Sequence, residues 1–157
     1  MPSPALFSRA SDEWSTPLDL YASLDAEFHF TLDAAATAEN ATSPTFLTRD
    51  QDALLARWGL IPSHRAGRPV VWLNPPYSKV RRFMQKAQEE AARGCTVVCL
   101  VPSRTDTGWF HTYAWDAVSH RPQPYVEVRF LRGRLKFGAG TGSAPFPSMI
   151  VIFRPVP

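Results

Sequence analysis

Four adjacent residues, Asn74, Pro75, Pro76 and Tyr77, follow the apolar run VVWL and carry groups suited to chemistry. The two prolines end a strand abruptly and fix the backbone around them, because each locks φ and lacks an N–H donor. The side-chain oxygen of Asn74 and the carbonyl oxygen of Pro75 are therefore two hydrogen-bond acceptors in fixed positions. Tyr77 adds an aromatic ring on which a planar ligand can stack.

Two preorganised acceptors favour attack by a poor nitrogen nucleophile, such as an exocyclic amino group whose lone pair is delocalised into a heterocycle. Each acceptor takes one N–H hydrogen bond and holds the lone pair toward a methyl donor. The alternative is a strand-ending turn with a packed tyrosine. The functional interpretation is favoured by position, because ligands of open α/β sheets bind at the carboxyl ends of the strands.

The segment before this motif predicts a helix followed by a short strand. Thr16 suits a helix N-cap and Pro17 the first helical position. Apolar residues then recur at helical spacing, which predicts a helix over roughly 17–27. Alternation of apolar and polar residues over 28–32 predicts a strand that ends at Asp33.

The segment around and after the motif predicts two buried strands and a helix between them. The runs 70–73 and 96–102 are almost entirely apolar, which is typical of central strands. The helix over 78–94 is amphipathic, with charged residues on one side and Gly94 at its end. Its apolar side is formed by Val80, Phe83 or Met84, Ala87 and Ala91.

Shorter elements complete the predicted fold. Helices are expected within 51–58 and 105–118, a hairpin around Arg132 and Gly133, and a last strand over 148–155. Strands alternate with helices through the first two thirds of the chain. The expected fold class is therefore an α/β sandwich with a mostly parallel sheet and a late antiparallel hairpin.

Composition excludes some classes of protein. With 157 residues, 45% of them hydrophobic, the chain suits one domain over 12–157 after a flexible tail over 1–11. No run is long enough to cross a membrane and no signal peptide is evident, so a cytoplasmic location is expected. The formal net charge of +3 permits a nucleic-acid partner. Within one strand, Cys95 and Cys99 would lie about 13 Å apart, too far for a disulfide, and no Cys or His spacing matches a metal site.

Several segments together resemble a known family. LNPPYS resembles the catalytic motif of amino-group methyltransferases that use S-adenosylmethionine. The wider frame resembles the phage-type DNA N6-adenine methyltransferases of the Dam family. The matching segments are DEWSTP at 12–17, FHFTLDAAAT at 28–37, WLNPPYS at 72–78, VCLVPSRTDTGWFH at 98–111, GRLKFG at 133–138 and APFPSMIVIFRP at 144–155.

This resemblance covers nearly the whole chain beyond the tail. It implies a Rossmann-like methyltransferase fold, S-adenosylmethionine as cofactor and DNA as substrate. It also implies that the target adenine is flipped out of the duplex, because a stacked base cannot reach a site of this kind. Tyr77 would then be the stacking platform for the flipped base.

The resemblance also implies where the cofactor binds. Trp14, Thr16 and Pro17 match the segment that lies against the methionine part of the cofactor, although helix capping also explains Thr16 and Pro17. Asp33 matches the acidic residue at the cofactor-binding strand end, where it approaches the positive end of the cofactor. An ordinary turn aspartate is the alternative for Asp33.

The chain departs from the general methyltransferase pattern after Asp33. Ala34 and Ala35 stand where glycines are usual, so close approach of the cofactor to the backbone is less assured. Glu39 is a candidate to hold the ribose, and Asp50 or Asp52 to hydrogen-bond the adenine of the cofactor. Acidic residues in exposed loops need no such role.

Residues that face substrate are expected near the same sheet edge. Ser103, Arg104 and Asp106 follow the third strand, and Asp106 equally suits a helix N-cap. Ser78 and Lys79 directly follow the catalytic motif, where they suit contacts with DNA close to the flipped base.

The predicted hairpin offers a basic surface. Arg129, Arg134 and Lys136 share one face of it, which suits contacts with DNA phosphates. A solvated sheet face explains the same pattern.

Two other functions fit the sequence. Motifs like this one also occur in enzymes that methylate guanine amino groups in RNA or glutamine amides in proteins. The alanines after Asp33 also leave open a DNA-binding module that has lost catalysis. Cofactor binding would separate both enzymes from the module.

Overall fold

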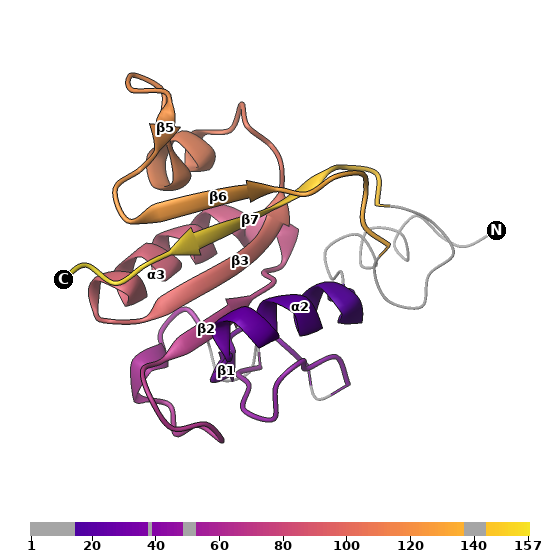
Figure 1. Ribbon diagram of the computed structural model, residues 1–157, viewed down its shortest axis with the longest axis vertical. Coiled ribbons are helices and arrows are strands. Elements are labelled where there is room, and N and C mark those ends of the chain that lie inside the picture. The colour runs from indigo at the N-terminus through magenta and orange to yellow at the C-terminus, as the bar shows by residue number, and fades with distance from the viewer. Residues whose placement is uncertain (1–14, 38, 49–52, 137–143) are drawn as a thin grey trace.

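The computed structural model describes residues 15–37, 39–48, 53–136 and 144–157. Within these ranges the chain forms a five-stranded sheet with α2 and α3 on opposite faces (Figure 1). A two-stranded sheet lies beyond the outer strand of the main sheet. The expected tail, Trp14, Asp50 and Asp52 lie outside the described residues.

The five-stranded sheet is mixed, with strand order β1-β2-β3-β7-β6. β1, β2 and β3 pair in parallel, β7 is antiparallel to β3, and β6 is antiparallel to β7. The expected α/β class with parallel strands and a late antiparallel pair is confirmed. The bounds are Leu32–Asp33 (β1), Val70–Leu73 (β2), Thr96–Pro102 (β3), Val126–Phe130 (β6) and Ser148–Phe153 (β7).

Alternate side chains of the strands form two cores, because successive residues of a strand point to opposite faces. One core includes Val71, Leu73 and Val97 and is covered by α3 (Val80–Ala92). The other includes Trp72, Val98 and Leu100 and is covered by α2 (Leu18–Phe28). The expected apolar side of α3 is confirmed, since each of its named positions is buried. Both cysteines are free thiols and are buried.

The start of α2 differs from the prediction. The helix begins at Leu18, its N-cap is Pro17, and no side chain caps it. Thr16 is therefore not the capping residue. Its hydroxyl group contacts the sheet instead, because Trp72 and Asn74 present two N–H donors to it.

The expected strand over 28–32 is wrong in most of its length. Phe28 is the last residue of α2, His29 adopts a left-handed conformation with φ of 57°, and β1 has only two residues. The carboxylate of Asp25 accepts a hydrogen bond from the Phe30 N–H and forms a bidentate ion pair with Arg65. These bonds tie the helix end to the connector before β2 and leave no room for a longer strand.

The helix expected within 51–58 does not form over the described residues from 53 onward, which form a turn and then the 3-10 helix η2 (Trp58–Leu60). The buried indole of Trp58 explains this outcome. Its Nε1–H donates to the carbonyl of Ala53 at 2.9 Å, and its backbone N–H donates to the carboxylate of Glu90 at 3.1 Å. Tertiary bonds thus replace the helical ones.

The helix expected over 105–118 is shorter than predicted. A π-helical segment, η4 (Phe110–Ala114), is followed by β4 (Trp115–Asp116), which pairs antiparallel with β5 (Arg121–Pro122). Gln123 ends the helix. Its backbone N–H donates to the carbonyl of Ala114, and its side-chain amide donates to the carbonyls of His111 and Trp115.

The hairpin expected around Arg132 and Gly133 is also wrong. Gly133 does adopt a positive φ of 73°, as a bend requires, but the described residues 134–136 form no strand. β6 pairs instead with β7, which begins 18 residues after β6 ends (148 − 130). Long-range burial of the fully buried β7 outweighs the local turn signal.

Two charged residues of α3 lie on the side opposite to that predicted. Lys86 and Glu90 are 5% and 0% exposed, and their side chains form an ion pair at 2.8 Å. Arg93 Nη1 and the Trp58 N–H also donate to the Glu90 carboxylate. Burial alone would raise the pKa of Glu90, but Lys86 and Arg93 outweigh it and hold this pKa below its usual value.

Replacing Glu90 is expected to destabilise the fold. Glu90→Gln leaves the Lys86 ammonium group buried beside a neutral amide, so the free energy of unfolding should fall by about 3 kcal/mol. Urea unfolding at neutral pH measures it. Glu89→Gln, on the exposed side of the same helix, is the matched control and should change stability by less than about 0.5 kcal/mol. Equal effects of the two variants would contradict the role assigned to Glu90.

The stability difference between wild type and Glu90→Gln should also depend on pH. A carboxyl group whose pKa is lowered on folding stabilises the protein above its unfolded pKa, near 4.5, and this contribution disappears as pH falls through the folded value. The difference should therefore be constant at neutral pH and shrink in acid below pH 4.5. Urea titrations at several pH values test this.

Candidate active site

The carboxyl ends of β1, β2 and β3 meet at one edge of the sheet because the three strands are parallel. Asp33 is the last residue of β1, Asn74 directly follows β2, and Ser103 directly follows β3. β7 runs the opposite way, so its beginning lies at this edge too. The Ser103 N–H donates to the carbonyl of Pro147, just before β7.

The side chain of Asn74 is held by a residue from outside the sheet. Asn74 Nδ2 donates to Thr16 Oγ1 at 3.1 Å, and Trp72 Nε1 donates to the same oxygen at 3.3 Å. Thr16 is only 8% exposed. The nitrogen of the Asn74 amide therefore faces the start of α2, and Oδ1 is at the opposite end of the amide. Pro75 and Pro76 are both buried.

Tyr77 begins the short 3-10 helix η3 (Tyr77–Lys79) and is partly buried. Its ring meets that of Phe146 edge to face, with centroids 5.0 Å apart and planes at 75°. Burial raises the pKa of the Tyr77 hydroxyl group, an effect that the nearby charge of Arg104 partly offsets. The side chain is therefore a neutral aromatic group throughout the physiological pH range.

Asp33 is buried, and its carboxylate is used within the protein. Oδ2 accepts hydrogen bonds from the backbone N–H and the hydroxyl group of Thr42, at 3.0 and 2.7 Å. Oδ1 accepts a longer bond of 3.4 Å from the Ala35 N–H. Burial raises the pKa of Asp33, and these bonds partly counter it. The carboxylate thus anchors the loop between β1 and residue 47, which returns to pair with Asp33 through Leu47.

The alanines after Asp33 are placed differently from each other. Ala34 is fully buried and its N–H donates to the Trp72 carbonyl, so it continues the sheet. Ala35 is partly buried at the sheet edge.

Glu39 is exposed, in the turn that Thr37 and Asn40 close by hydrogen bonds between them. Pro17 is partly buried beside Thr16.

The other expected site residues lie at the surface. Ser78, Lys79 and Arg104 are exposed and Ser103 is partly buried. Arg134 is exposed in the segment after the carboxyl end of β6. Asp106 is exposed and does not cap η4, whose N-cap is Trp109. Trp14 and Asp52 fall outside the described residues.

The expected basic face is not available at Arg129. Its guanidinium group forms a bidentate ion pair with Glu27 of α2, at 2.7 and 2.8 Å, and a second ion pair with Glu127. Arg154 also pairs with Glu127. Arg129 is therefore part of the contact between α2 and the sheet, which corrects its predicted place on a free cationic face.

Three residues with a clear place in the site were not assigned a role from the sequence. Phe146 contacts Tyr77, Trp72 shares the oxygen of Thr16, and Thr42 binds Asp33. A tryptophan in a fully apolar strand is a usable signal, because its indole N–H needs an acceptor when buried. Phe146 and Thr42 give no such local signal.

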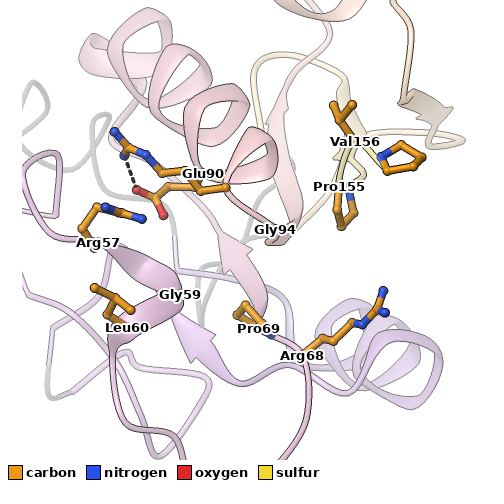
Figure 2. A pocket seen from close by; sticks show the side chains of 11 residues that line it. Arg57, Gly59, Leu60, Arg68, Pro69, Glu90, Gly94, Pro155 and Val156 are labelled. Atoms are coloured by element: carbon orange, nitrogen blue, oxygen red, sulfur yellow. Dashed lines mark hydrogen bonds and ion pairs between the residues drawn. The ribbon is translucent and has the colours of Figure 1, made fainter.

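An open pocket of about 520 Å³ lies at the other edge of the sheet (Figure 2). It is lined by residues that precede β2 and β3, such as Pro69 and Gly94, and by the end of the chain after β7. None of the predicted site residues that the structure describes lines it.

Two further properties bear on function. No helix in the described part of the chain is both long and apolar enough to span a membrane. Among the same residues, no group of three or more His, Cys, Asp or Glu side chains is placed to hold a metal ion.

Comparison with known proteins agrees with the motifs. The family model described as DNA N-6-adenine-methyltransferase (Dam) matches residues 5–157. A DNA N-6-adenine-methyltransferase of Escherichia phage T1 is 35% identical over 100 residues, 63% of this chain and 39% of that protein. One of Haemophilus phage HP1 is 29% identical over 147 residues, 92% of this chain and 79% of that protein. The match over almost the full chain shows that this protein belongs to the DNA N-6-adenine-methyltransferase (Dam) family.

Proposed function

We propose that the protein transfers a methyl group from S-adenosylmethionine to N6 of adenine in DNA, on a Rossmann-like methyltransferase fold. The observation that carries this proposal is the Asn74 amide at the carboxyl edge of parallel strands, with its nitrogen held by Thr16. Both relatives described above are named as enzymes of this activity. The chain spans 39% of the T1 relative, and features of the remaining part are not transferred to it.

The two acceptors of the motif act on the amino group of the base. S-adenosylmethionine supplies a methyl group bound to a positively charged sulfur. Asn74 Oδ1 and the Pro75 carbonyl oxygen accept hydrogen bonds from the two N6–H groups of adenine, which favours a tetrahedral nitrogen and reduces the delocalisation of its lone pair into the ring. The bound cofactor would supply the methyl carbon to N6, with the carbon–sulfur bond breaking as the new bond forms and a neutral thioether as the leaving group. One N6 proton departs to water, so no side chain is required as a base.

The aromatic pair at this edge suits a flipped base. Tyr77 offers a neutral ring for stacking, and Phe146 packs edge-on against that ring and holds its position. Flipping brings N6 beside Asn74, three residues from Tyr77 in the chain. Ser78 and Ser103 are the proposed polar neighbours of the flipped nucleotide.

The cofactor is placed between the ends of β1 and β2. Asp33, an acidic residue at the end of β1, suits a ligand that carries a sulfonium cation. Pro17 and Ala35 are the proposed neighbours of its methionine part, and Glu39 the proposed partner of its ribose. Ala34 contributes only its position, because its N–H already bonds to the sheet. Asp52, outside the described residues, keeps its proposed role toward the cofactor's adenine.

Asp33 is proposed to act through the loop that it anchors. Both of its carboxylate oxygens bond within the chain, one of them to Thr42 at 2.7 Å. The loop between β1 and residue 47 is thereby fixed at the edge where the cofactor is placed. Asp33 is thus proposed to support the cofactor site by holding this loop in place.

Exposed cations at the same edge suit the DNA backbone. Lys79, Arg81, Arg82 and Arg104 lie on η3, α3 and the loop after β3, and Arg134 follows β6. Such contacts fix the register of a duplex without reading its sequence. RNA and protein glutamine remain alternative acceptors for the same chemistry.

The direct test is transfer of labelled methyl from S-adenosylmethionine to unmethylated DNA, RNA and protein extract, followed by digestion to nucleosides and amino acids. Label in N6-methyladenine from DNA is the expected result. Label in RNA or protein would show that the substrate is RNA or protein instead of DNA. Absence of both transfer and cofactor binding would support an inactive module instead.

Asn74→Ala is expected to remove turnover while leaving cofactor affinity nearly intact. The variant lacks one of two acceptors that act only on the reacting amino group, so kcat should fall by about a hundred-fold or more. Calorimetry should give a cofactor Kd within about two-fold of wild type, because Asn74 is assigned no contact with the cofactor. Gln85→Ala, which removes an exposed amide of α3, is the control. Loss of cofactor binding together with turnover would contradict the assignment.

Tyr77 is expected to contribute its ring to catalysis. Tyr77→Phe should retain most activity, whereas Tyr77→Ala should raise the Kd for DNA about ten-fold, because base stacking is lost. Fluorescence anisotropy of a labelled duplex measures the DNA Kd of each variant. If Tyr77→Phe bound DNA as weakly as Tyr77→Ala, the hydroxyl group and not stacking would be responsible for the contribution of Tyr77 to binding.

If Asp33 acts through the loop that it anchors, Thr42 should also affect the affinity for S-adenosylmethionine. Asp33→Asn should raise the Kd for S-adenosylmethionine about ten-fold. Thr42→Val, which removes the 2.7 Å bond, should raise it in the same direction by about three-fold, since the backbone bond remains. Thr42→Ser keeps the hydroxyl group and is the control. An effect of Asp33→Asn with none of Thr42→Val would indicate direct contact with the cofactor.

A further inference from the structure

We propose that Thr16 is a positioning residue for methyl transfer, which orients the amide of Asn74 and is itself fixed by Trp72. This inference rests on the proposed function of Asn74. It gives Thr16 a role in the chemical step that is separate from any contact with the cofactor. Three side chains from two layers of the fold carry it.

The oxygen of Thr16 has a fixed place relative to β2. The indole N–H of Trp72 can only donate, so Thr16 Oγ1 must be the acceptor in their 3.3 Å contact. Trp72 is 0% exposed, and its ring packs against Phe30, with centroids 5.4 Å apart, and edge-on against Tyr21, with centroids 5.6 Å apart. The acceptor is thus held by a fully buried side chain of the core.

Asn74 reaches the same oxygen for a geometric reason. Side chains two residues apart in an extended chain point to the same face, so Trp72 and Asn74 both face the α2 layer. The two donors share Thr16 Oγ1 at 3.3 and 3.1 Å. A hydroxyl oxygen has two lone pairs and can accept both bonds.

This arrangement selects one of two orientations of the Asn74 amide. With Nδ2 toward Thr16, the acceptor Oδ1 is the end that remains for the adenine amino group. The flipped amide would turn Nδ2 toward that amino group, and two donors would then face each other. Loss of the Thr16 hydroxyl group removes the bond that favours the productive orientation.

Thr16 is not needed to begin α2. The N-cap of the helix is Pro17, no side chain caps it, and the first helical bond runs from the Tyr21 N–H to the Pro17 carbonyl. A variant at position 16 that keeps the shape of the side chain should therefore preserve the helix. The effect of losing the hydroxyl group can then be measured in a folded enzyme.

The test compares Thr16→Val, which keeps the shape and loses the hydroxyl group, with Thr16→Ser, which keeps it. Thr16→Val should lower kcat by about ten-fold or more with the cofactor Kd within about two-fold of wild type, and Thr16→Ser should stay within about three-fold in both. An increase in Kd alone would make Thr16 a cofactor contact and overturn the proposal. An unchanged kcat in Thr16→Val, or an equal loss in Thr16→Ser, would also overturn it.

A measurement without activity separates this proposal from the proposed function. In ¹⁵N-labelled protein, the side-chain NH₂ signals of Asn74 are identified by their absence in Asn74→Asp. A contact between these protons and the Thr16 side chain is expected in wild type, and these signals should shift in Thr16→Val. Unshifted signals would refute the positioning role. Failure of wild type to methylate any acceptor, with the contact present, would refute only the proposed function.

A folding control completes the test. Circular dichroism and the melting temperature show whether Thr16→Val keeps the fold. If it does not, Thr16→Ala takes its place, because the smaller side chain leaves room for a water molecule beside the donors of Trp72 and Asn74. The kcat and Kd criteria are the same for this variant.

Discussion

Parallel pairing of β1, β2 and β3 is the constraint on which the site depends. Parallel strands end at the same edge, so Asp33 and Asn74, 41 positions apart in the chain, both lie at that edge. β2 is only four residues long, and the prolines that follow it stop the strand at the point where Asn74 is needed. The antiparallel β7 then begins at this edge and delivers Phe146 to Tyr77.

Helix α2 is joined to the sheet at both of its ends by polar bonds. Thr16, just before its first turn, accepts from Trp72 and Asn74, while Asp25 in its last turn binds Arg65 of the connector before β2. The apolar face between these ends packs on the sheet. Movement of α2 along the sheet would therefore break the bonds at both ends, and one of them belongs to the proposed site.

Periodicity predicted the buried strands and α3, because it reports which face of an element is apolar. It failed where a distant partner decides. Thr16 is a residue type typical of a helix N-cap. Its actual place is decided by a hydrogen bond from Trp72, 56 residues later in the chain. Lys86 and Glu90 were placed on the solvent side, because a pattern of polar residues does not show that two charges are buried as a pair. The end of β2 before Asn74 was predictable because the prolines that follow act locally.

The two edges of the sheet have different physical demands. At the edge opposite the site, Glu90 is fully bonded to Lys86, Arg93 and the Trp58 N–H, so its charge is satisfied within the fold. The proposed site must instead keep acceptor groups for a ligand, and the proposed orientation of Asn74 by Thr16 meets that demand with a neutral side chain. A neutral amide draws out the lone pair of an amino group without adding a buried charge, whose desolvation would cost more than an amide's. An asparagine therefore suffices for the proposed transfer, in which no side chain is required as a base.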